Sequence, residues 1–218
     1  MGESTATQTL AARTLQEIDQ ERVLESDWGG GRSPFGVSWA KFMMWIFLAS
    51  DALTFAGLLS GYGVARLHSG TWPRQGEIFN LWVVATMTFL LICSSATMAM
   101  AVGAARRGDR GAAVRFLALT ILGGLSFLGM QAYEWTHFIR EGARLTTNPW
   151  GVPLFSATFF VITGFHGGHV TSGVLYLLAV TVRALRGRYS AEGVEIAGLY
   201  WHFVDLVWVF IFTLLYLI

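Results

Sequence analysis

The chain alternates between long apolar runs and short breaks that are charged or rich in glycine and proline. Five runs are long enough to cross a hydrocarbon core of about 30 Å, which takes about 20 helical residues. They cover residues 38–65, 79–104, 112–138, 155–183 and 195–218. Lipid offers no partners to backbone amides, so runs of this length are predicted to be helices. The pattern predicts an all-α polytopic membrane protein, a bundle of five transmembrane helices.

The first 37 residues follow a different pattern. They are polar, carry six acids and three arginines, and contain no long apolar stretch. A cleaved signal peptide needs an apolar stretch, so none is predicted. We expect residues 1–37 to form a polar tail with one short helix around 8–25, and residues 38–218 to form the transmembrane domain.

Composition agrees with this division and excludes other classes of protein. Hydrophobic residues make up 54% of the chain and charged residues only 13%, against about 25% charged in globular proteins. A net charge of +1 provides no basic surface for nucleic acid. The single cysteine, Cys93, lies in an apolar run and excludes a disulfide scaffold or a thiolate metal cluster.

The basic residues predict the orientation. Eleven fall in or next to the tail and the second and fourth loops, and four fall in the first and third loops. Positive loops face the cytoplasm, so we expect a cytoplasmic N-terminus and an outer C-terminus. The eleven are Arg13, Arg22, Arg32, Lys41, Arg106, Arg107, Arg110, Arg115, Arg183, Arg186 and Arg188; the four are Arg66, Arg74, Arg140 and Arg144.

A few ionisable side chains fall inside the predicted spans. A charge within the bilayer is unfavourable, so each is a candidate functional group that should face the bundle or a wet cavity. Three pairs are each three residues apart and so share a helical face: Glu134 with His137, His166 with His169, and His202 with Asp205. The candidates are Asp51, Glu134, His166, His169, His202 and Asp205.

Two interpretations of these groups are open, metal ligation and hydrogen bonding between helices. Glu-x-x-His pairs build metal sites in four-helix bundles. The three pairs, however, spread over about 15 Å of depth at the rise of a helix and cannot share one metal. A smaller metal site of Asp51, His166 and His169 is the alternative, and we favour hydrogen bonding. Asp51 has no facing Arg or Lys, so it is expected to be protonated or bonded to a histidine.

Glycines recur at positions where helices could pack closely. Gly57 and Gly61 lie on one helical face, as do Gly164 and Gly168. Small residues four apart allow close helix–helix approach in membranes. The same role is predicted for three glycines of the third run: Gly123, Gly124 and Gly129.

Four segments resemble, in order, subunit III of haem–copper respiratory oxidases. Residues 200–216, with the motif Tyr-Trp-His-Phe-Val-Asp, resemble that family's C-terminal helix. Residues 45–57, with Ser-Asp, resemble its carboxylate-bearing helix, and residues 129–135 its Gln/Tyr/Glu helix. Residues 155–170 are similar to its His-Gly-x-His-Val helix. The resemblance covers nearly everything after residue 38.

Two departures from the mitochondrial-type pattern refine the resemblance. That form has seven helices, and this chain resembles the shortened five-helix bacterial form that lacks the first two. The mitochondrial-type form also has Glu after the serine that matches Ser50, whereas this chain has Asp51, whose side chain is one methylene shorter. A five-helix chain with Ser-Asp also resembles subunit III of bacterial quinol oxidases of the bo type.

The resemblance implies an accessory role in aerobic respiration in a bacterial inner membrane. Haem and copper are then expected in partner subunits, with no catalytic centre, cofactor or metal in this chain. The expected partners are subunit I as the main contact, subunit II, a fourth subunit or a respiratory supercomplex, and phospholipid. The subunit would stabilise the catalytic subunit and support proton uptake and dioxygen access. A cytochrome c oxidase is favoured because residues 131–135 look closer to that type.

The resemblance also implies roles for the polar residues. The set comprising Asp51, Glu134, His166, His169, His202 and Asp205 would hold the lipid-filled cleft of the family together and set its polarity. Arg66 and Trp72 would contact lipid near the outer surface. Two alternatives are a related subunit that accompanies a nitric oxide reductase and an independent transporter or metal protein.

Overall fold

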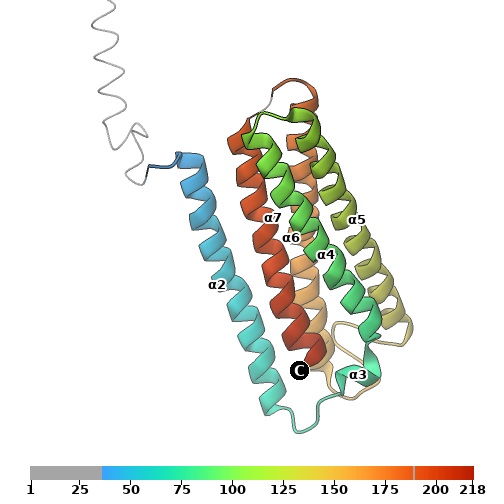
Figure 1. The fold of residues 1–218 in the computed structure, drawn as a ribbon. Helices are drawn as coiled ribbons and strands as arrows, with labels where there is room; N and C mark the ends of the chain where they lie inside the picture. Colours follow the sequence, from blue (N-terminus) through green and yellow to red (C-terminus); the bar gives the residue numbers. More distant parts are fainter. Residues whose placement is uncertain (1–35, 189) are drawn as a thin grey trace, which may run out of the picture. The chain divides into compact units, whose positions relative to one another are not determined.

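The computed structural model describes residues 36–188 and 190–218, and within them the regular structure is helical (Figure 1). Five of these helices are long and apolar enough to cross a membrane. The elements are α2 (Trp39–His68), α3 (Gln75–Ile78), α4 (Leu81–Arg106), α5 (Arg110–Arg140), α6 (Pro153–Leu185), α7 (Ala191–Ile211) and the π-helical turn η1 (Phe212–Leu217). When η1 is counted with α7, the ends of the five candidate spans lie within about one turn of the bounds of the five apolar runs. The predicted helix around 8–25 lies outside the described residues.

Local sequence signals set the helix ends. Side chains at the N-cap accept hydrogen bonds from the first turns of three long helices, and so satisfy backbone donors that have no helical partner. These caps are Asn80 to the Trp82 amide, Asp109 to the Ala112 amide and Ser190 to the Gly193 amide. Glycines with positive φ, a conformation in which residues with a Cβ are strained, lie one residue beyond the C-caps of three helices. These are Gly108, Gly142 and Gly187.

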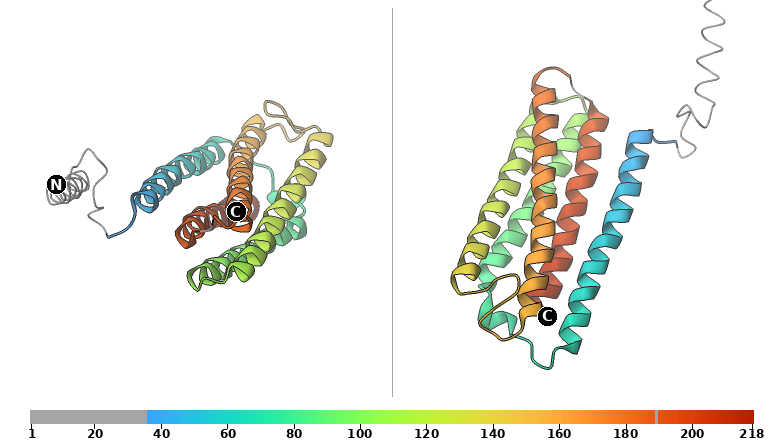
Figure 2. Two further views of the ribbon diagram at one scale, coloured as in Figure 1. Left: turned by 90° about the horizontal axis from the view of Figure 1, so that it is seen from above. Right: turned by 180° about the vertical axis from the view of Figure 1, so that it is seen from behind.

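The described residues fall into two units, 36–46 and 47–218. In the first, the rings of Trp39 and Phe42 meet edge to face with centroids 5.8 Å apart. In the second, α4, α5, α6 and α7 run alongside one another, as both views show (Figures 1 and 2). The functional candidates lie in this second unit.

The core of the second unit centres on Trp201 of α7, which is 1% exposed. Its indole nitrogen donates to the Ser94 hydroxyl of α4 at 3.1 Å. Its ring fills the space left by two glycines, Gly124 of α5 and Gly173 of α6. One buried indole therefore contacts all three neighbouring helices.

From Phe47 onward, α2 reaches α6 and α7 through long side chains. The Phe55 ring meets the rings of Phe165, His169 and Phe203 at centroid distances of 5.0, 5.2 and 6.5 Å. An apolar cavity of about 210 Å³ lies between this part of α2 and α7. Its lining includes Ala52, Phe55, Leu59, Phe203, Leu206 and Phe210.

The glycine prediction is right at some positions and wrong at others. A Cβ at Gly123 would lie 2.7 Å from Ser94, and one at Gly164 would lie 3.0 Å from Trp135, so close packing is confirmed at these two sites. A Cβ at Gly124 would lie closer still to a neighbouring atom, 2.5 Å from the Trp201 ring. The prediction is wrong within this chain at the positions where a Cβ would meet no described atom within 4 Å: Gly57, Gly61, Gly129 and Gly168.

Candidate functional site

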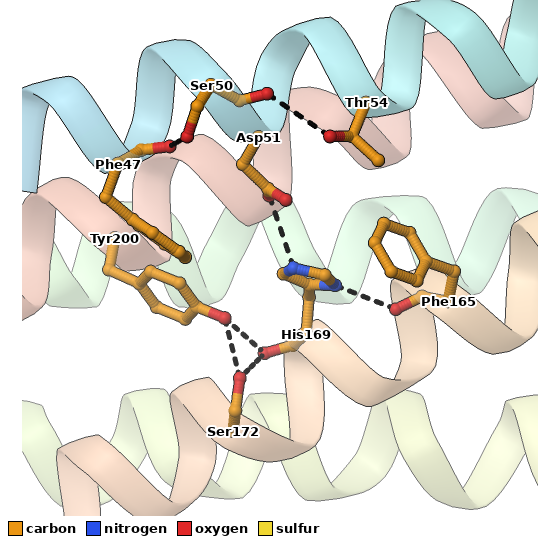
Figure 3. Close-up of polar contacts among 8 residues, drawn as sticks. All are labelled: Phe47, Ser50, Asp51, Thr54, Phe165, His169, Ser172 and Tyr200. Atoms are coloured by element: carbon orange, nitrogen blue, oxygen red, sulfur yellow. Dashed lines mark hydrogen bonds and ion pairs between the residues drawn. The ribbon is translucent and has the colours of Figure 1, made fainter.

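Asp51 of α2 and His169 of α6 face each other across the two helices (Figure 3). The His169 Nε2 atom lies 3.2 Å from Asp51 Oδ2, and the two side chains are only 16% and 10% exposed. The contact has the distance of an ion pair but not the alignment of a hydrogen bond, because Oδ2 accepts none from the described residues. The structure thus pairs the carboxylate of α2 with one of the two histidines of α6.

The other ring nitrogen of His169 restricts where protons can sit. Nδ1 lies 2.9 Å from the Phe165 carbonyl oxygen, which can only accept, so Nδ1 carries a proton. If Nε2 is also protonated, the imidazolium pairs with the Asp51 carboxylate. If Nε2 is unprotonated, its lone pair would repel the carboxylate unless Asp51 is protonated. Each favourable state has one proton between the two groups and no net charge on the pair, as a membrane interior requires.

Hydroxyl groups hold the backbone of the histidine in place. The Tyr200 hydroxyl of α7 donates to the His169 carbonyl oxygen at 3.1 Å, and it lies 2.6 Å from the Ser172 hydroxyl. The Phe47 ring of α2 stacks on Tyr200 with centroids 6.1 Å apart (Figure 3). Side chains from α2, α6 and α7 therefore position the Asp51–His169 pair.

His166 occupies a different environment from His169. It is fully buried among aromatic rings, stacked on Trp208 at 5.2 Å and edge to face with Phe127 at 5.7 Å. Neither ring nitrogen has a hydrogen-bond partner among the described residues. The small metal site with Asp51 is not formed, since no group of three His, Cys, Asp or Glu in the described residues could hold a metal ion.

Glu134 lies at the end of α5, away from Asp51. Its Oε2 accepts a hydrogen bond of 2.9 Å from Tyr216 in the π-helical turn η1. His137 points elsewhere and lies 3.4 Å from Glu141, with both side chains exposed. Glu134 and His137 both line an open cavity of about 260 Å³ next to α3 and the start of α4.

His202 and Asp205 form a third polar site, between α7 and α4. The Nδ1 atom of His202 lies 2.6 Å from the Ser95 hydroxyl. Asp205 lies next to the same hydroxyl, and its Oδ1 has no partner among the described residues. The six candidates are therefore divided among separate contacts and do not form one cluster.

The two predicted lipid-contact residues lie at the end of α2 and in the loop after it. Arg66 is half-buried in the last turn of the helix. The Trp72 ring packs edge to face against Tyr62 of α2 and Phe155 of α6, at 5.6 and 5.5 Å. Trp72 thus joins α2 to α6.

Comparison with known proteins shows the family to which the chain belongs. The family model described as cytochrome c oxidase subunit III matches residues 9–218. Cytochrome c oxidase subunit 3 of Bacillus sp. (strain PS3) is 36% identical over 181 residues, which are 81% of this chain and 85% of the relative. Quinol oxidase subunit 3 of Bacillus subtilis (strain 168) is 37% identical over 177 residues, 79% of this chain and 84% of the relative. The probable cytochrome c oxidase subunit 3 of Mycobacterium leprae (strain TN) is 36% identical, with 79% and 85% covered.

The chain belongs to the cytochrome c oxidase subunit III family. This confirms the resemblance that the four segments indicated. As a subunit III, the chain is a multi-pass membrane protein and part of a haem–copper oxidase complex with other subunits.

Several polar partners in this subunit III were not predicted from the sequence. The ionisable residues were selected, but the hydroxyl groups around them were not: Ser95 contacts His202, Tyr216 donates to Glu134, and Ser172 and Tyr200 donate to the His169 carbonyl oxygen. The amide of Gln131 also crosses from α5 to the Thr163 carbonyl oxygen of α6, at 2.6 Å. A buried tyrosine usually bonds its hydroxyl to a partner, and this was the available signal for Tyr200 and Tyr216.

Tyr216→Phe tests the contact at the end of α5. We expect it to lower stability by about 1–3 kcal/mol, because Glu134 Oε2 loses its donor in a largely buried position. Hydrogen exchange of the last turn of α7 and thermal unfolding of the purified complex measure the effect. Tyr133→Phe, at an exposed position of α5 next to Glu134, is the matched control. Equal stability of the two variants would contradict the prediction.

Proposed function

We propose that this subunit III is the accessory, non-redox subunit of a bacterial cytochrome c oxidase. In this role it stabilises the catalytic subunit I, also contacts subunit II, and supports proton uptake and dioxygen access. A fourth subunit or a respiratory supercomplex would be a further partner. Haem and copper belong to the partner subunits in this proposal, and the chain itself performs no electron transfer.

The Asp51–His169 pair carries the proposal. It is neutral as a pair, is largely shielded from solvent and has one proton between a carboxylate and an imidazole. Such a pair can pass its proton between the carboxylate and the imidazole with little rearrangement, and ionisable groups within membrane spans commonly serve proton relays. It also joins α2 to α6. One contact can therefore serve both proton handling and the cohesion of the subunit.

The apolar cavity between α2 and α7 supports the proposed binding of structural lipid. Its side chains are aromatic or aliphatic, which suits an acyl chain. Arg66 and Trp72 are proposed to contact the lipid near the head-group region. Glu134, His166, His202 and Asp205 are proposed to maintain the polarity and the packing around this region.

The absence of redox centres from the chain is a proposal from its residue inventory. The sequence has five histidines and one cysteine. His68 and His137 lie in the last turns of α2 and α5, toward the helix ends. The cytoplasmic N-terminus is proposed from the distribution of Lys and Arg, and the bacterial inner membrane is proposed from the similarity to bacterial oxidase subunits.

A quinol oxidase is the second candidate. The relatives named quinol oxidase subunit 3 are 37% identical to this chain, and the Bacillus relative named cytochrome c oxidase subunit 3 is 36% identical. Identity therefore does not favour either electron donor. The proposal of cytochrome c rests on residues 131–135.

Purification of the native complex tests the proposal and separates the candidates. We expect the chain to co-purify with haem-bearing and copper-containing subunits that oxidise reduced cytochrome c and consume dioxygen. Haem spectra, copper content and donor-specific oxygen uptake are the measurements. Oxidation of quinol alone would establish the second candidate, and nitric oxide reduction would establish a companion of that reductase. Activity or bound metal in the isolated chain would contradict an accessory role.

A further inference from the structure

An open cavity of about 260 Å³ lies beside α3, where α4 begins and α5 ends. Its lining includes Glu77 of α3, Val83 in the first turn of α4, and Tyr133 and Glu134 near the end of α5. It shares no lining residue with the apolar cavity beside α2. The roles proposed above assign no ligand to it.

Glu134 is hydrogen-bonded in this cavity but not ion-paired. Its Oε2 accepts from the neutral Tyr216 hydroxyl at 2.9 Å. Within the part of the chain that the structure describes, no Lys, Arg or His lies within ion-pair distance of Glu134. His137, three residues further along α5, instead lies 3.4 Å from Glu141. Shielded charges in proteins are usually paired, so the half-buried Glu134 is available to a cation from outside the chain.

Glu77 increases the negative charge of the cavity. Its carboxylate lies 3.7 Å from Arg74, and both side chains are exposed, so water weakens this pair. His137 also lines the cavity, but even a protonated imidazole would offset only one of the two carboxylates. The cavity therefore attracts cations.

The lining favours an organic cation over a metal ion. No group of three His, Cys, Asp or Glu in the described residues could hold a metal ion. Phe79, Val83 and Phe138 give the cavity apolar walls, which suit the methylene groups of a lysine or arginine side chain. A volume of about 260 Å³ is below the roughly 300–1,000 Å³ of typical small-molecule sites. One basic side chain therefore fits this cavity better than a larger ligand does.

Two exposed aromatic side chains indicate that the cation comes from a protein. Tyr133 lines the cavity and is 64% exposed, and Trp82, next to the lining residue Val83, is 85% exposed. Tyrosine and tryptophan are enriched at protein–protein interfaces. The chain is part of a complex with other oxidase subunits, and a neighbouring subunit that reaches Glu134 could pack on both rings.

We propose that this cavity is a docking site for a lysine or arginine side chain of a neighbouring oxidase subunit. The basic group pairs with the Glu134 carboxylate, and the Tyr216 hydrogen bond holds that carboxylate in position. The proposal rests on the membership of a complex and is independent of the proton, lipid and electron-donor roles proposed above. A soluble organic cation is the other source of the same chemistry.

Glu134→Gln in the purified complex tests the proposal. Glutamine keeps an oxygen that can accept from Tyr216 but carries no charge, so the variant should fold and lose only the ion pair. Removing one member of a shielded charge pair mainly speeds dissociation. We expect the dissociation constant of the chain from the rest of the complex, measured by native mass spectrometry, to rise at least about tenfold, which corresponds to about 1.4 kcal/mol. Glu141→Gln, at the C-cap of α5 but outside the cavity lining, is the matched control, and equal dissociation constants for the two variants would overturn the proposal.

Carboxyl footprinting of the wild type needs no variant. A water-soluble carbodiimide couples glycine ethyl ester to accessible carboxylates, and peptide mass spectrometry measures the labelling. Glu77, whose side chain is 72% exposed in this chain, should be labelled in the chain released from the complex and should largely lose its labelling in the complex. Equal labelling in the two samples would overturn the proposal. Protection that gel filtration of the complex removes and added methylguanidinium restores would also overturn it, and would assign the cavity to a soluble cation.

Discussion

Gly124→Ala is expected to destabilise the bundle by about 1–3 kcal/mol, the range for overpacking a filled core. An alanine Cβ would lie 2.5 Å from Cη2 of Trp201 and 2.8 Å from Cγ2 of Val174. The indole cannot easily withdraw. Its nitrogen is bonded to Ser94, and its other ring edge lies 3.1 Å from where a Cβ of Gly173 would be. The strain must therefore move α5 away from α6 and α7.

Gly129→Ala on the same helix is the matched control. No described atom lies within 4 Å of its added Cβ, and alanine is favoured over glycine in a helix interior by about 1 kcal/mol. The two substitutions should therefore shift the thermal unfolding of the complex in opposite directions. Equal shifts would show that α5 does not pack on Trp201 as described.

The double variant Gly124→Ala with Trp201→Phe locates the strain. A phenyl ring lacks the Cη2 atom that the added methyl group would meet, so the two changes should be less destabilising together than their separate effects predict. Contacting residues commonly show coupling energies of about 0.5–3 kcal/mol. Additive effects would place the strain of Gly124→Ala elsewhere.

The helices were predictable from sequence because every membrane-spanning segment needs about 20 apolar residues and must satisfy its backbone hydrogen bonds within its own helix. Polar caps such as Asn80 and Ser190 and the glycines after the helices then set the ends. The contacts between helices were less predictable. Gly124 and Gly129 both looked like packing positions, but only Gly124 faces a neighbouring helix of this chain.

The candidate residues were predictable, and so was a histidine partner for Asp51, but the sequence did not show which histidine it would be. Residues three apart on a helix are about 60° apart around its axis. This is enough to place His166 among the core rings and His169 against Asp51. The spacing that grouped the two histidines could not show that one is a core residue and the other a partner of α2.

Hydroxyl partners could not be predicted for a similar reason. Most serines and threonines in membrane helices bond the carbonyl one turn earlier, as Thr181 does with Leu177 and Ser126 with Leu122. Ser95 instead reaches His202 on another helix, and Ser172 contacts the Tyr200 hydroxyl of another helix in addition to the His169 carbonyl one turn earlier. The residue type is the same in both cases, and only the helix facing it differs.

Asp51→Ala is expected to leave the complex assembled but to shorten its catalytic lifetime. The substitution removes the group that faces Nε2 of His169 and leaves that nitrogen unpaired in a largely buried position. An unpaired buried polar group costs about 1–3 kcal/mol. If this destabilises the working state against the inactivated one, inactivation should be at least about fivefold faster. The measurements are the haem spectrum for assembly and the number of turnovers before dioxygen consumption stops. Ser50→Ala, whose hydroxyl bonds only its own helix at the Phe47 carbonyl, is the control and should behave as wild type.

Asp51→Asn distinguishes a proton-handling role from a structural one. An amide has nearly the size of the carboxyl group and can donate an N–H to a neutral Nε2, so it preserves the contact between α2 and α6. It cannot release or accept a proton as the carboxyl group does. If Asp51 supports proton uptake, the asparagine variant should inactivate as fast as the alanine variant while matching wild type in thermal stability. If the pair only holds two helices together, the asparagine variant should restore the lifetime. Unchanged lifetime in both variants would remove Asp51 from any role in turnover, because the Asp51–His169 contact would then be dispensable both as a proton-carrying pair and as a link between α2 and α6.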